Sequence, residues 1–178
     1  MVTQNITVDG RIELLDDWFQ PSPASGYDDL QAEMDRQGDE TEAMLLGRRT
    51  FEDFRGYWPQ HTDEPAGASL ERLPKFVVSS TLDDPGWVRS TVLPGDPVAE
   101  TRQLKDDGDG DLVVTGSISL THALFRAGLV DELRLFVHPA VQGRGRGLVA
   151  EGTVPPTLSQ RETRTFRSGV VLLRYGVG

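Results

Sequence analysis

The chain has 178 residues, 37% of them hydrophobic, and a net charge of −10, a balance typical of one globular domain with a buried core. The acidic balance argues against nonspecific nucleic-acid binding, and no apolar run is long enough to suggest a membrane span. Cysteine is absent, which excludes disulfides, thiol catalysis and cysteine-based zinc sites. No secretory signal is visible, so we expect a single cytoplasmic domain over residues 1–178.

Hydrophobic periodicity, turn residues and helix-cap residues predict the elements of the first 70 residues. They are, in chain order, a strand at 2–8, a loop at 13–27, a helix at 28–37 with Asp28 or Asp29 near its cap, a strand at 44–46, a helix through about Phe54 and a loop at 61–69.

The same signals predict the rest of the chain, where strands and helices alternate and the last elements are strands. The predicted elements are strands at 76–79 and 88–93, a helix at 97–105, a polar turn at 106–111, a strand at 112–115, a helix at 118–127 ended by Gly128, a strand at 132–138 and a hairpin of 157–166 with 170–175. This order predicts a three-layer α/β/α fold with a mostly parallel central sheet and an antiparallel C-terminal hairpin.

Two segments share one local pattern, residues 44–54 and residues 112–124. In each, an apolar strand ends at a glycine, and hydroxyl or arginine side chains open a short helix. A helix N-terminus offers free backbone N–H groups and the positive end of the helix dipole, so it suits a phosphate group. Two such ends in one small domain suggest a ligand with more than one phosphate, and a nucleotide cofactor is the natural candidate.

These segments belong to four blocks that resemble the dihydrofolate reductase superfamily, and more closely its riboflavin-biosynthesis reductase branch. The blocks span nearly the whole chain and are Thr7–Ile12, Leu45–Phe51 with Tyr57–Pro59, Val77–Ser80, and Val114–Ser117 running on to Gly128–Leu133. The resemblance implies the dihydrofolate reductase-like fold, NADPH as the cofactor and a homodimer. It also implies a small-molecule substrate rather than nucleic acid or a membrane.

The resemblance assigns the cofactor to three strand ends. It implies that Gly47, Arg48, Arg49 and Thr50 bind the pyrophosphate and 2′-phosphate, that Ser79 and Ser80 hold the ribose or its 2′-phosphate, and that Thr115, Gly116, Ser117 and Ile118 let the pyrophosphate approach the backbone. The alternatives are ordinary helix caps at Thr50 and at Ser117 or Ser119, solvent-facing arginines, and a plain strand end at Ser79 and Ser80.

The substrate candidates lie at the first strand end and in a glycine-rich segment. Asp9 is the candidate catalytic and substrate-binding carboxylate, although Asp-Gly is also a common turn pair. Trp18 is a candidate stacking residue, although large aromatic side chains are more often core. Arg144 and Arg146 are candidates for an anionic substrate group, although a surface turn is the other interpretation of residues 143–147. The histidines show no metal-ligand spacing, so no metal is expected.

Three functional hypotheses follow. The leading one is an NADPH-dependent reductase acting on a small heterocycle or its ribosylamino form, resembling 5-amino-6-(5-phosphoribosylamino)uracil reductase. The second is a nucleotide-binding module without turnover, motivated by the low glycine content of residues 116–119 and the absence of a clear acid. The third is a dihydrofolate reductase proper, whose proton-relay acid would be among Asp28, Asp29 and Glu33.

Overall fold

A computed structural model describes residues 1–19, 26–108, 110–154 and 156–178. Within them the backbone forms one eight-stranded sheet in the order β4-β3-β2-β5-β1-β6-β8-β7. The strands from β4 to β6 in this order are parallel, and β8 and β7 are antiparallel to their neighbours. The strands are β1 (Val2–Thr7), β2 (Ala43–Gly47), β3 (Lys75–Val78), β4 (Ser90–Leu93), β5 (Leu112–Thr115), β6 (Glu132–His138), β7 (Leu158–Thr165) and β8 (Val171–Val177).

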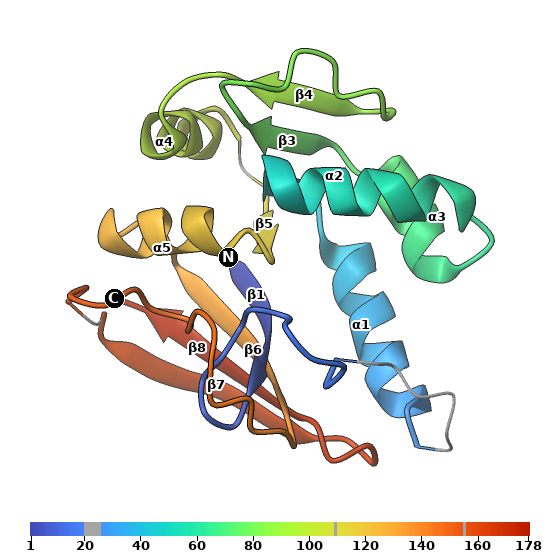
Figure 1. Cartoon of the computed structure of the whole chain (residues 1–178), viewed down its shortest axis with the longest axis vertical. Helices are drawn as coiled ribbons and strands as arrows, with labels where there is room; N and C mark the ends of the chain where they lie inside the picture. The colour runs from blue at the N-terminus through green and yellow to red at the C-terminus, as the bar shows by residue number, and fades with distance from the viewer. Residues whose placement is uncertain (20–25, 109, 155) are drawn as a thin grey trace.

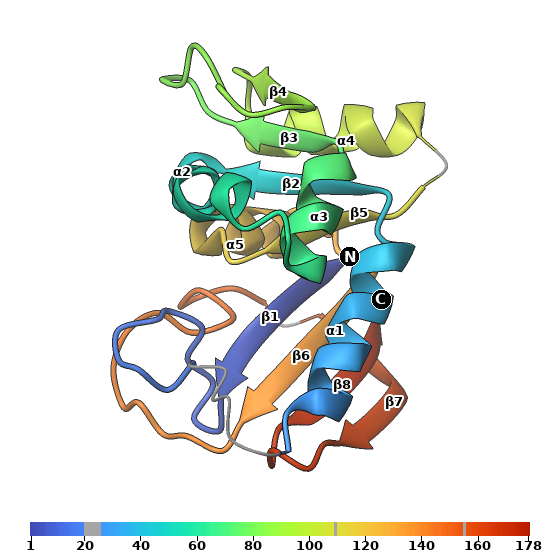
Figure 2. The same cartoon turned by 90° about the vertical axis from the view of Figure 1, so that its right-hand side faces the viewer.

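The helices lie on both faces of the sheet, with α1, α2 and α3 on one face and α4 and α5 on the other (Figures 1 and 2). They are α1 (Asp28–Glu40), α2 (Arg48–Tyr57), the 3-10 helix η1 (Trp58–Gln60), α3 (Pro65–Arg72), α4 (Pro97–Asp107) and α5 (Ile118–Arg126). The predicted three-layer α/β/α fold with an antiparallel C-terminal hairpin is confirmed.

Apolar strand residues bury both faces of the parallel region, as expected where helices cover a sheet on both sides. Ile6 and Val114 pack with Leu124 of α5 in one cluster. Leu46 and Phe51 of α2 pack with other residues in a second cluster. Burying a side chain of this size contributes about 1.5–3 kcal/mol, so these clusters fix α2 and α5 against the strands that precede them.

The loop expected at 61–69 is wrong in its second half, because α3 begins at Pro65. Proline is well tolerated in the first turn of a helix, and Leu70 gives this helix a buried apolar contact. Gly67 is also required here, since a Cβ atom at this position would lie 2.0 Å from the carbonyl oxygen of His61. Here Pro65 marks the start of a helix and Gly67 allows close packing against the His61 carbonyl, although both residue types are also typical of a loop.

Other element bounds shift by a few residues. The helix expected at 28–37 extends to Glu40. Its N-cap is Tyr27, which has no capping side-chain hydrogen bond, and Asp28 and Asp29 lie in the first turn, near the cap as expected. The polar turn expected at 106–111 begins later, because α4 continues to Asp107. Residue 109 of that turn and residues 20–25 of the loop expected at 13–27 lie outside the described residues. No helix in the described ranges has the length and apolar character needed to cross a membrane.

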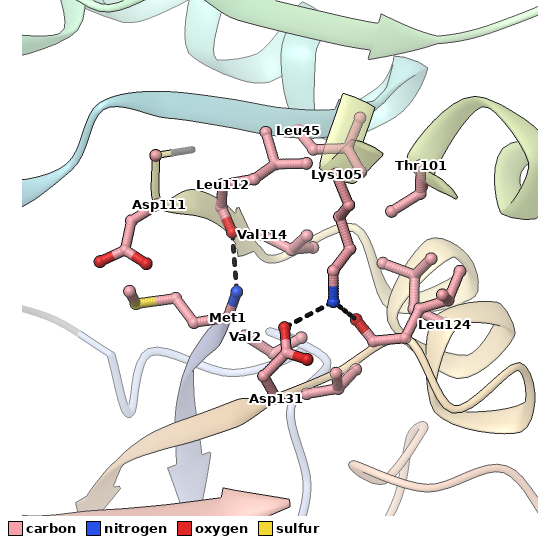
Figure 3. Close-up of a pocket in the computed structure, with 13 residues that line it drawn as sticks. Met1, Val2, Leu45, Thr101, Lys105, Asp111, Leu112, Val114, Leu124 and Asp131 are labelled. Atoms are coloured by element: carbon pink, nitrogen blue, oxygen red, sulfur yellow. Dashed lines mark hydrogen bonds and ion pairs between the residues drawn. The ribbon is translucent and has the colours of Figure 1, made fainter. Parts of the chain in front are cut away.

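The parallel strands all end at one edge of the sheet, where the arrowheads of β1, β2, β3 and β6 point the same way (Figure 2). The opposite edge holds a cavity of about 70 Å³ beside Met1 (Figure 3). There the Met1 amino group donates to Leu112 O at 2.8 Å, and Lys105 Nζ lies 2.6 Å from the Asp131 carboxylate. This space is far smaller than the roughly 300–1,000 Å³ typical of ligand pockets. A second space at the same ends of the strands, lined by Ala43, Pro74 and Leu112, has about 300 Å³ and is at the lower limit of that range.

Candidate functional site

The predicted cofactor residues lie together at the carboxyl ends of the parallel strands, here called the carboxyl edge of the sheet. β2 ends at Gly47, β3 runs into Ser79, and β5 runs into Gly116. Because β2 lies between β3 and β5 in a parallel sheet, these three strand ends are neighbours. Ligands of open α/β sheets bind at this edge.

Hydrogen bonds join the turn after β2 to the turn after β5. Ser117 Oγ accepts from the Gly47 amide at 2.9 Å, and the Ser117 amide donates to Thr50 Oγ1, also at 2.9 Å. Gln4 of β1 supports the second turn from below, because its Nε2 donates to Gly116 O at 2.7 Å. The hydroxyls of Thr50 and Ser117 therefore fix the two helix N-termini relative to each other rather than capping their own helices.

The N-termini of α2 and α5 have no hydrogen bond from a capping side chain. The N-cap residues are Gly47 for α2 and Ser117 for α5. Their first-turn N–H groups therefore lack a capping side chain, which is the arrangement that binds phosphate. Gly116 at φ +56° and Ser117 at φ +41° are both left-handed, which turns the backbone sharply into α5. A Cβ atom on Gly116 would lie 3.1 Å from Thr50 Cγ2, so the close approach of the two turns also favours glycine.

The two predicted phosphate-binding arginines differ in their partners. Arg48 Nη1 lies 3.0 Å from both carboxylate oxygens of Glu52, one turn further along α2. Arg49 is exposed, and within the described residues it makes no hydrogen bond or ion pair. Arg49 is therefore the more available of the two for a phosphate group.

The remaining predicted cofactor residues also differ in availability. Ser79 is buried, and its Oγ accepts from the amides of Thr81 and Leu82. Ser80 is exposed at the same strand end. Ile118, the first residue of α5, is half-buried and packs against the core cluster that contains Leu120 and Leu124.

A groove of about 420 Å³ lies over the sheet and is lined by residues of α1 and α3, which cover the same face (Figure 2). Its floor is formed by residues of four strands: Thr3 and Asn5 of β1, Met44 of β2, Val113 and Thr115 of β5, and Arg134 and Phe136 of β6. Thr115 directly precedes Gly116, so the groove adjoins the linked helix N-termini. The volume is in the range of small-molecule sites.

Most polar residues of the groove were missed by sequence reasoning. Asn5 and Arg134 lie on central strands, where side chains alternate between the two covered faces. A polar residue on a central strand needs a hydrogen-bond partner, so a polar residue within these apolar strand sequences was the feature that could have indicated the groove. Asp35 of α1 also lines the groove and accepts from Gln31 Nε2 at 2.8 Å.

Asp9 is an anchor for a loop rather than a lining residue of the groove. Its carboxylate accepts from Thr7 Oγ1 at 2.6 Å, from the Gln142 amide at 3.1 Å and from the Gly143 amide at 2.8 Å. The Thr7 hydrogen bond and the two amides lower the pKa of Asp9 to about 2. Asp9 is therefore ionised at neutral pH and is poorly suited to donate a proton.

The two predicted substrate arginines are paired with carboxylates. Arg144 Nη2 lies 2.5 Å from Asp16 Oδ1, and Arg146 Nη2 lies 2.6 Å from Glu13 Oε1. The hydrogen bond from Arg146 also lowers the pKa of Glu13. Neither arginine lines the groove. The two pairs instead join residues 13–16 to residues 144–146.

Trp18 also belongs to this joined pair of loops. Its Nε1 donates to Gln142 Oε1 at 2.7 Å, and its ring packs edge-on against His138 with centroids 5.4 Å apart. Burial lowers the pKa of His138, so this side chain favours the neutral form. His138 Nε2 lies 3.0 Å from Asn5 Oδ1, which connects the loops to the floor of the groove.

The acids considered for a dihydrofolate reductase proper have other partners. Asp28 and Asp29 face Arg167, and Glu33 is buried against Arg36 and Arg164. None of the three acids lines the groove. Across the described residues, no group of three or more His, Cys, Asp or Glu side chains is placed to hold a metal ion.

A mixed sheet in this order, with two linked helix N-termini at its carboxyl edge and a groove beside them, defines a dihydrofolate reductase-like domain. The chain belongs to the RibD C-terminal domain family, whose model matches residues 1–172. The predicted RibD C-terminal domain-like branch of the superfamily is thereby confirmed.

One relative in sequence and three solved structures illustrate this placement. The chain is 31% identical to the uncharacterized protein YyaP of Bacillus subtilis (strain 168), over 96% of this chain and 90% of that protein. A putative riboflavin biosynthesis protein from Shewanella sp. PV-4 superposes with a TM-score of 0.76 at 18% identity, over 99% of this chain and 97% of that one. A pyrimidine reductase-like protein from Corynebacterium diphtheriae gives 0.66 at 14% identity, over 99% and 90% of the two chains.

The third structure is longer than this chain. It is a diaminohydroxyphosphoribosylaminopyrimidine deaminase/5-amino-6-(5-phosphoribosylamino)uracil reductase from Thermotoga maritima, with a TM-score of 0.66 and 15% identity. The match covers 99% of this chain and 56% of that protein. At these identities the three structures establish the fold alone.

Proposed function

We propose that this chain is an NADPH-dependent reductase acting on a small heterocyclic or ribosylamino-pyrimidine substrate. The observation that carries the proposal is the pair of uncapped helix N-termini, held together by Ser117 and Thr50 and adjoining the groove at Thr115. Two anion-binding helix ends at a fixed separation match a pyrophosphate, and a groove beside them matches a second, smaller ligand.

The residues around the two turns fit the cofactor. The first-turn amides of α2 and α5 would bind the pyrophosphate, with Gly116 allowing close approach. Arg49 is free to pair with a 2′-phosphate, and Arg48 would share its charge with Glu52. The Ser80 hydroxyl is exposed beside them, whereas Ser79 shapes the turn through its own hydrogen bonds. When bound, the cofactor supplies the hydride, and the protein supplies binding and orientation.

The loops that carry the predicted substrate residues would close one end of the site. Asp9, as an ionised anchor, holds residues 142–143 in place, and Trp18 packs on His138 behind Asn5. In this proposal Asp9 and Trp18 orient the substrate end of the site, and Arg144 and Arg146 fix the loops through their carboxylate partners. A single-domain chain, a homodimer and a cytoplasmic location remain predictions.

The nearest reaction is the one named for the Thermotoga maritima relative, reduction of 5-amino-6-(5-phosphoribosylamino)uracil. The test is steady-state oxidation of NADPH, followed at 340 nm, with that compound and in parallel with dihydrofolate. Turnover with the uracil compound or a related heterocycle supports the proposal. Turnover with dihydrofolate would support a dihydrofolate reductase proper, although Asp28, Asp29 and Glu33 lie outside the groove. Tight NADPH binding with no turnover on either compound, or on a wider panel of heterocycles, would favour a binding module.

A further inference from the structure

Lys75, at the start of β3, is a lysine whose ammonium group lies inside the protein. Its exposed fraction is 0%, and its Nζ donates to Leu70 O at 2.6 Å and to Leu73 O at 2.8 Å. The ring of Trp87 lies 4.4 Å from the same nitrogen and makes a cation–π contact with it. The ammonium group therefore joins β3 to the C-terminal end of α3 and to Trp87.

α3 is a short helix that depends on contacts with the rest of the protein. It has 8 residues, and helices shorter than about 12–15 residues are marginal on their own. The last carbonyls of a helix have no partner within it, and Lys75 supplies both donors and the positive charge that a helix C-terminus favours. Glu71, in the last turn of α3, accepts from Trp87 Nε1 at 2.8 Å. Lys75 thus holds this turn through its backbone, and Trp87 holds it through Glu71.

A charge in this place is costly, and an apolar side chain of similar length would avoid the cost. Burial lowers the pKa of Lys75 to about 8; of the charged neighbours, Glu71 raises this pKa and Arg89 lowers it. Met44, its neighbour on β2, is uncharged. At neutral pH the ammonium form still predominates, so the two carbonyls receive charge-assisted hydrogen bonds. Buried charges of this kind are better suited to fixing one arrangement of the chain than to adding stability, and here the arrangement is the position of α3.

Leu70 and Leu73, whose carbonyls accept from Lys75, both line the groove, whereas Lys75 itself is not among the described residues that line it. We propose that Lys75 is a positioning residue for the groove: it holds Leu70 and Leu73 where a ligand in the groove contacts them, without touching the ligand. α3 takes no part in the hydrogen bonds that link the helix N-termini of α2 and α5. Loss of the ammonium group should therefore weaken ligand binding in the groove and leave cofactor binding unchanged. The inference rests on the proposed function only for the identity of that ligand.

The experiment compares the full-length wild type with Lys75→Met, which keeps an unbranched side chain of similar length but has no ammonium group. Lys105→Met is the matched control, since Lys105 is the only other lysine of the sequence and lies on α4, on the other face of the sheet. NADPH oxidation with 5-amino-6-(5-phosphoribosylamino)uracil gives KM and kcat, and titration gives the Kd for NADPH. We expect Lys75→Met to raise KM at least about 5-fold, with kcat and the Kd for NADPH within about 2-fold of the wild type. We expect Lys105→Met to behave as the wild type.

Two outcomes overturn the proposal. One is an unchanged KM in Lys75→Met. The other is a loss of NADPH affinity in parallel with the rise in KM, because this would indicate general damage to the fold rather than a misplaced groove wall.

A second measurement needs neither turnover nor a variant, and it decides the matter if Lys75→Met does not fold. In the wild type with ¹³C-labelled leucine and lysine, raising the pH from about 6.5 to about 9.5 removes the charge of Lys75. The methyl signals of Leu70 and Leu73 must then shift together with the Lys75 side-chain signal, whereas those of Leu172, which is buried in another cluster, must not. Leu70 and Leu73 signals that stay fixed during this titration overturn the inference. If the wild type does not turn over the uracil compound, the proposed function fails for that substrate, and the leucine signals alone decide the inference.

Discussion

Replacing Thr50 by valine tests the link between the two helix N-termini. Valine keeps the branched shape of threonine but removes the oxygen that accepts from the Ser117 amide at 2.9 Å. Ser117 is 8% exposed, so its amide would lose its partner in a poorly hydrated place. An unsatisfied buried donor costs about 1–3 kcal/mol, which for a chain of this size lowers Tm by about 2–12 °C.

The same change should weaken the cofactor site, because the hydrogen bond sets the spacing of the two turns. If about 1 kcal/mol of the cost falls on the cofactor complex, the Kd for NADPH rises about 5-fold. Urea unfolding measures the stability, and NADPH titration measures the affinity. Thr50→Ser is the matched control, since it keeps the hydroxyl and should stay near the wild type in affinity. If Thr50→Val has the stability and the NADPH affinity of the wild type, the argument that this hydrogen bond holds the two turns of the cofactor site together is refuted.

Three further predictions use the same assays. Gly116→Ala should lower the free energy of unfolding by about 1–2 kcal/mol and weaken NADPH binding, because residue 116 has a left-handed φ and its Cβ would lie 3.1 Å from Thr50. Gly128→Ala is the control, since Gly128 is also left-handed but has open space around it, and this variant should bind NADPH with the wild-type affinity. Asp9 has a folded pKa of about 2, below its ordinary value of 3.8, so it stabilises the fold above about pH 4 and this contribution is lost as the pH falls to 2. Urea midpoints of Asp9→Asn should therefore depend less on pH over this window than those of the wild type. Burial lowers the pKa of Lys75 to about 8 from 10.5, so the unfolded chain binds more protons than the folded chain between pH 8 and 10.5. The free energy of unfolding of the wild type should therefore rise across this window relative to that of Lys75→Met. Parallel plots of unfolding free energy against pH for the two proteins would contradict this.

The parallel core of the fold was predictable because its signals are local. The apolar runs at 44–46 and 112–115 each end at glycine, and the helices after them are amphipathic, so both turns follow from the sequence. What the sequence did not show is that Thr50 and Ser117 bond to each other's turns, 67 positions apart. In a sequence, a hydroxyl side chain at the start of a helix is interpreted as a helix cap. The hydrogen bonds between the two turns become evident only when β2 and β5 are known to be neighbours in the sheet.

The substrate side of the site was less accessible to sequence reasoning. Arg144 and Arg146 suggested an anion, but their partners Asp16 and Glu13 lie some 130 positions away, at 128 and 133 residues. The groove depends on strand register, which sets Thr3 opposite Arg134 and Asn5 opposite Phe136. Its second wall is α3, in a segment expected to be a loop. A polar residue on a central strand was the one available signal.

The central claim is that the linked helix N-termini bind a nucleotide cofactor, and NADPH titration tests it most directly. Energy transfer from the tryptophans to NADPH reports binding to the wild type, to Arg49→Ala, and to Arg102→Ala as an exposed control on α4. We expect saturable binding to the wild type and to Arg102→Ala, several-fold weaker binding to Arg49→Ala, and weaker binding of NADH than of NADPH. Absence of NADPH binding, or equal affinity in all three proteins, would contradict the assignment of this edge of the sheet as the cofactor site.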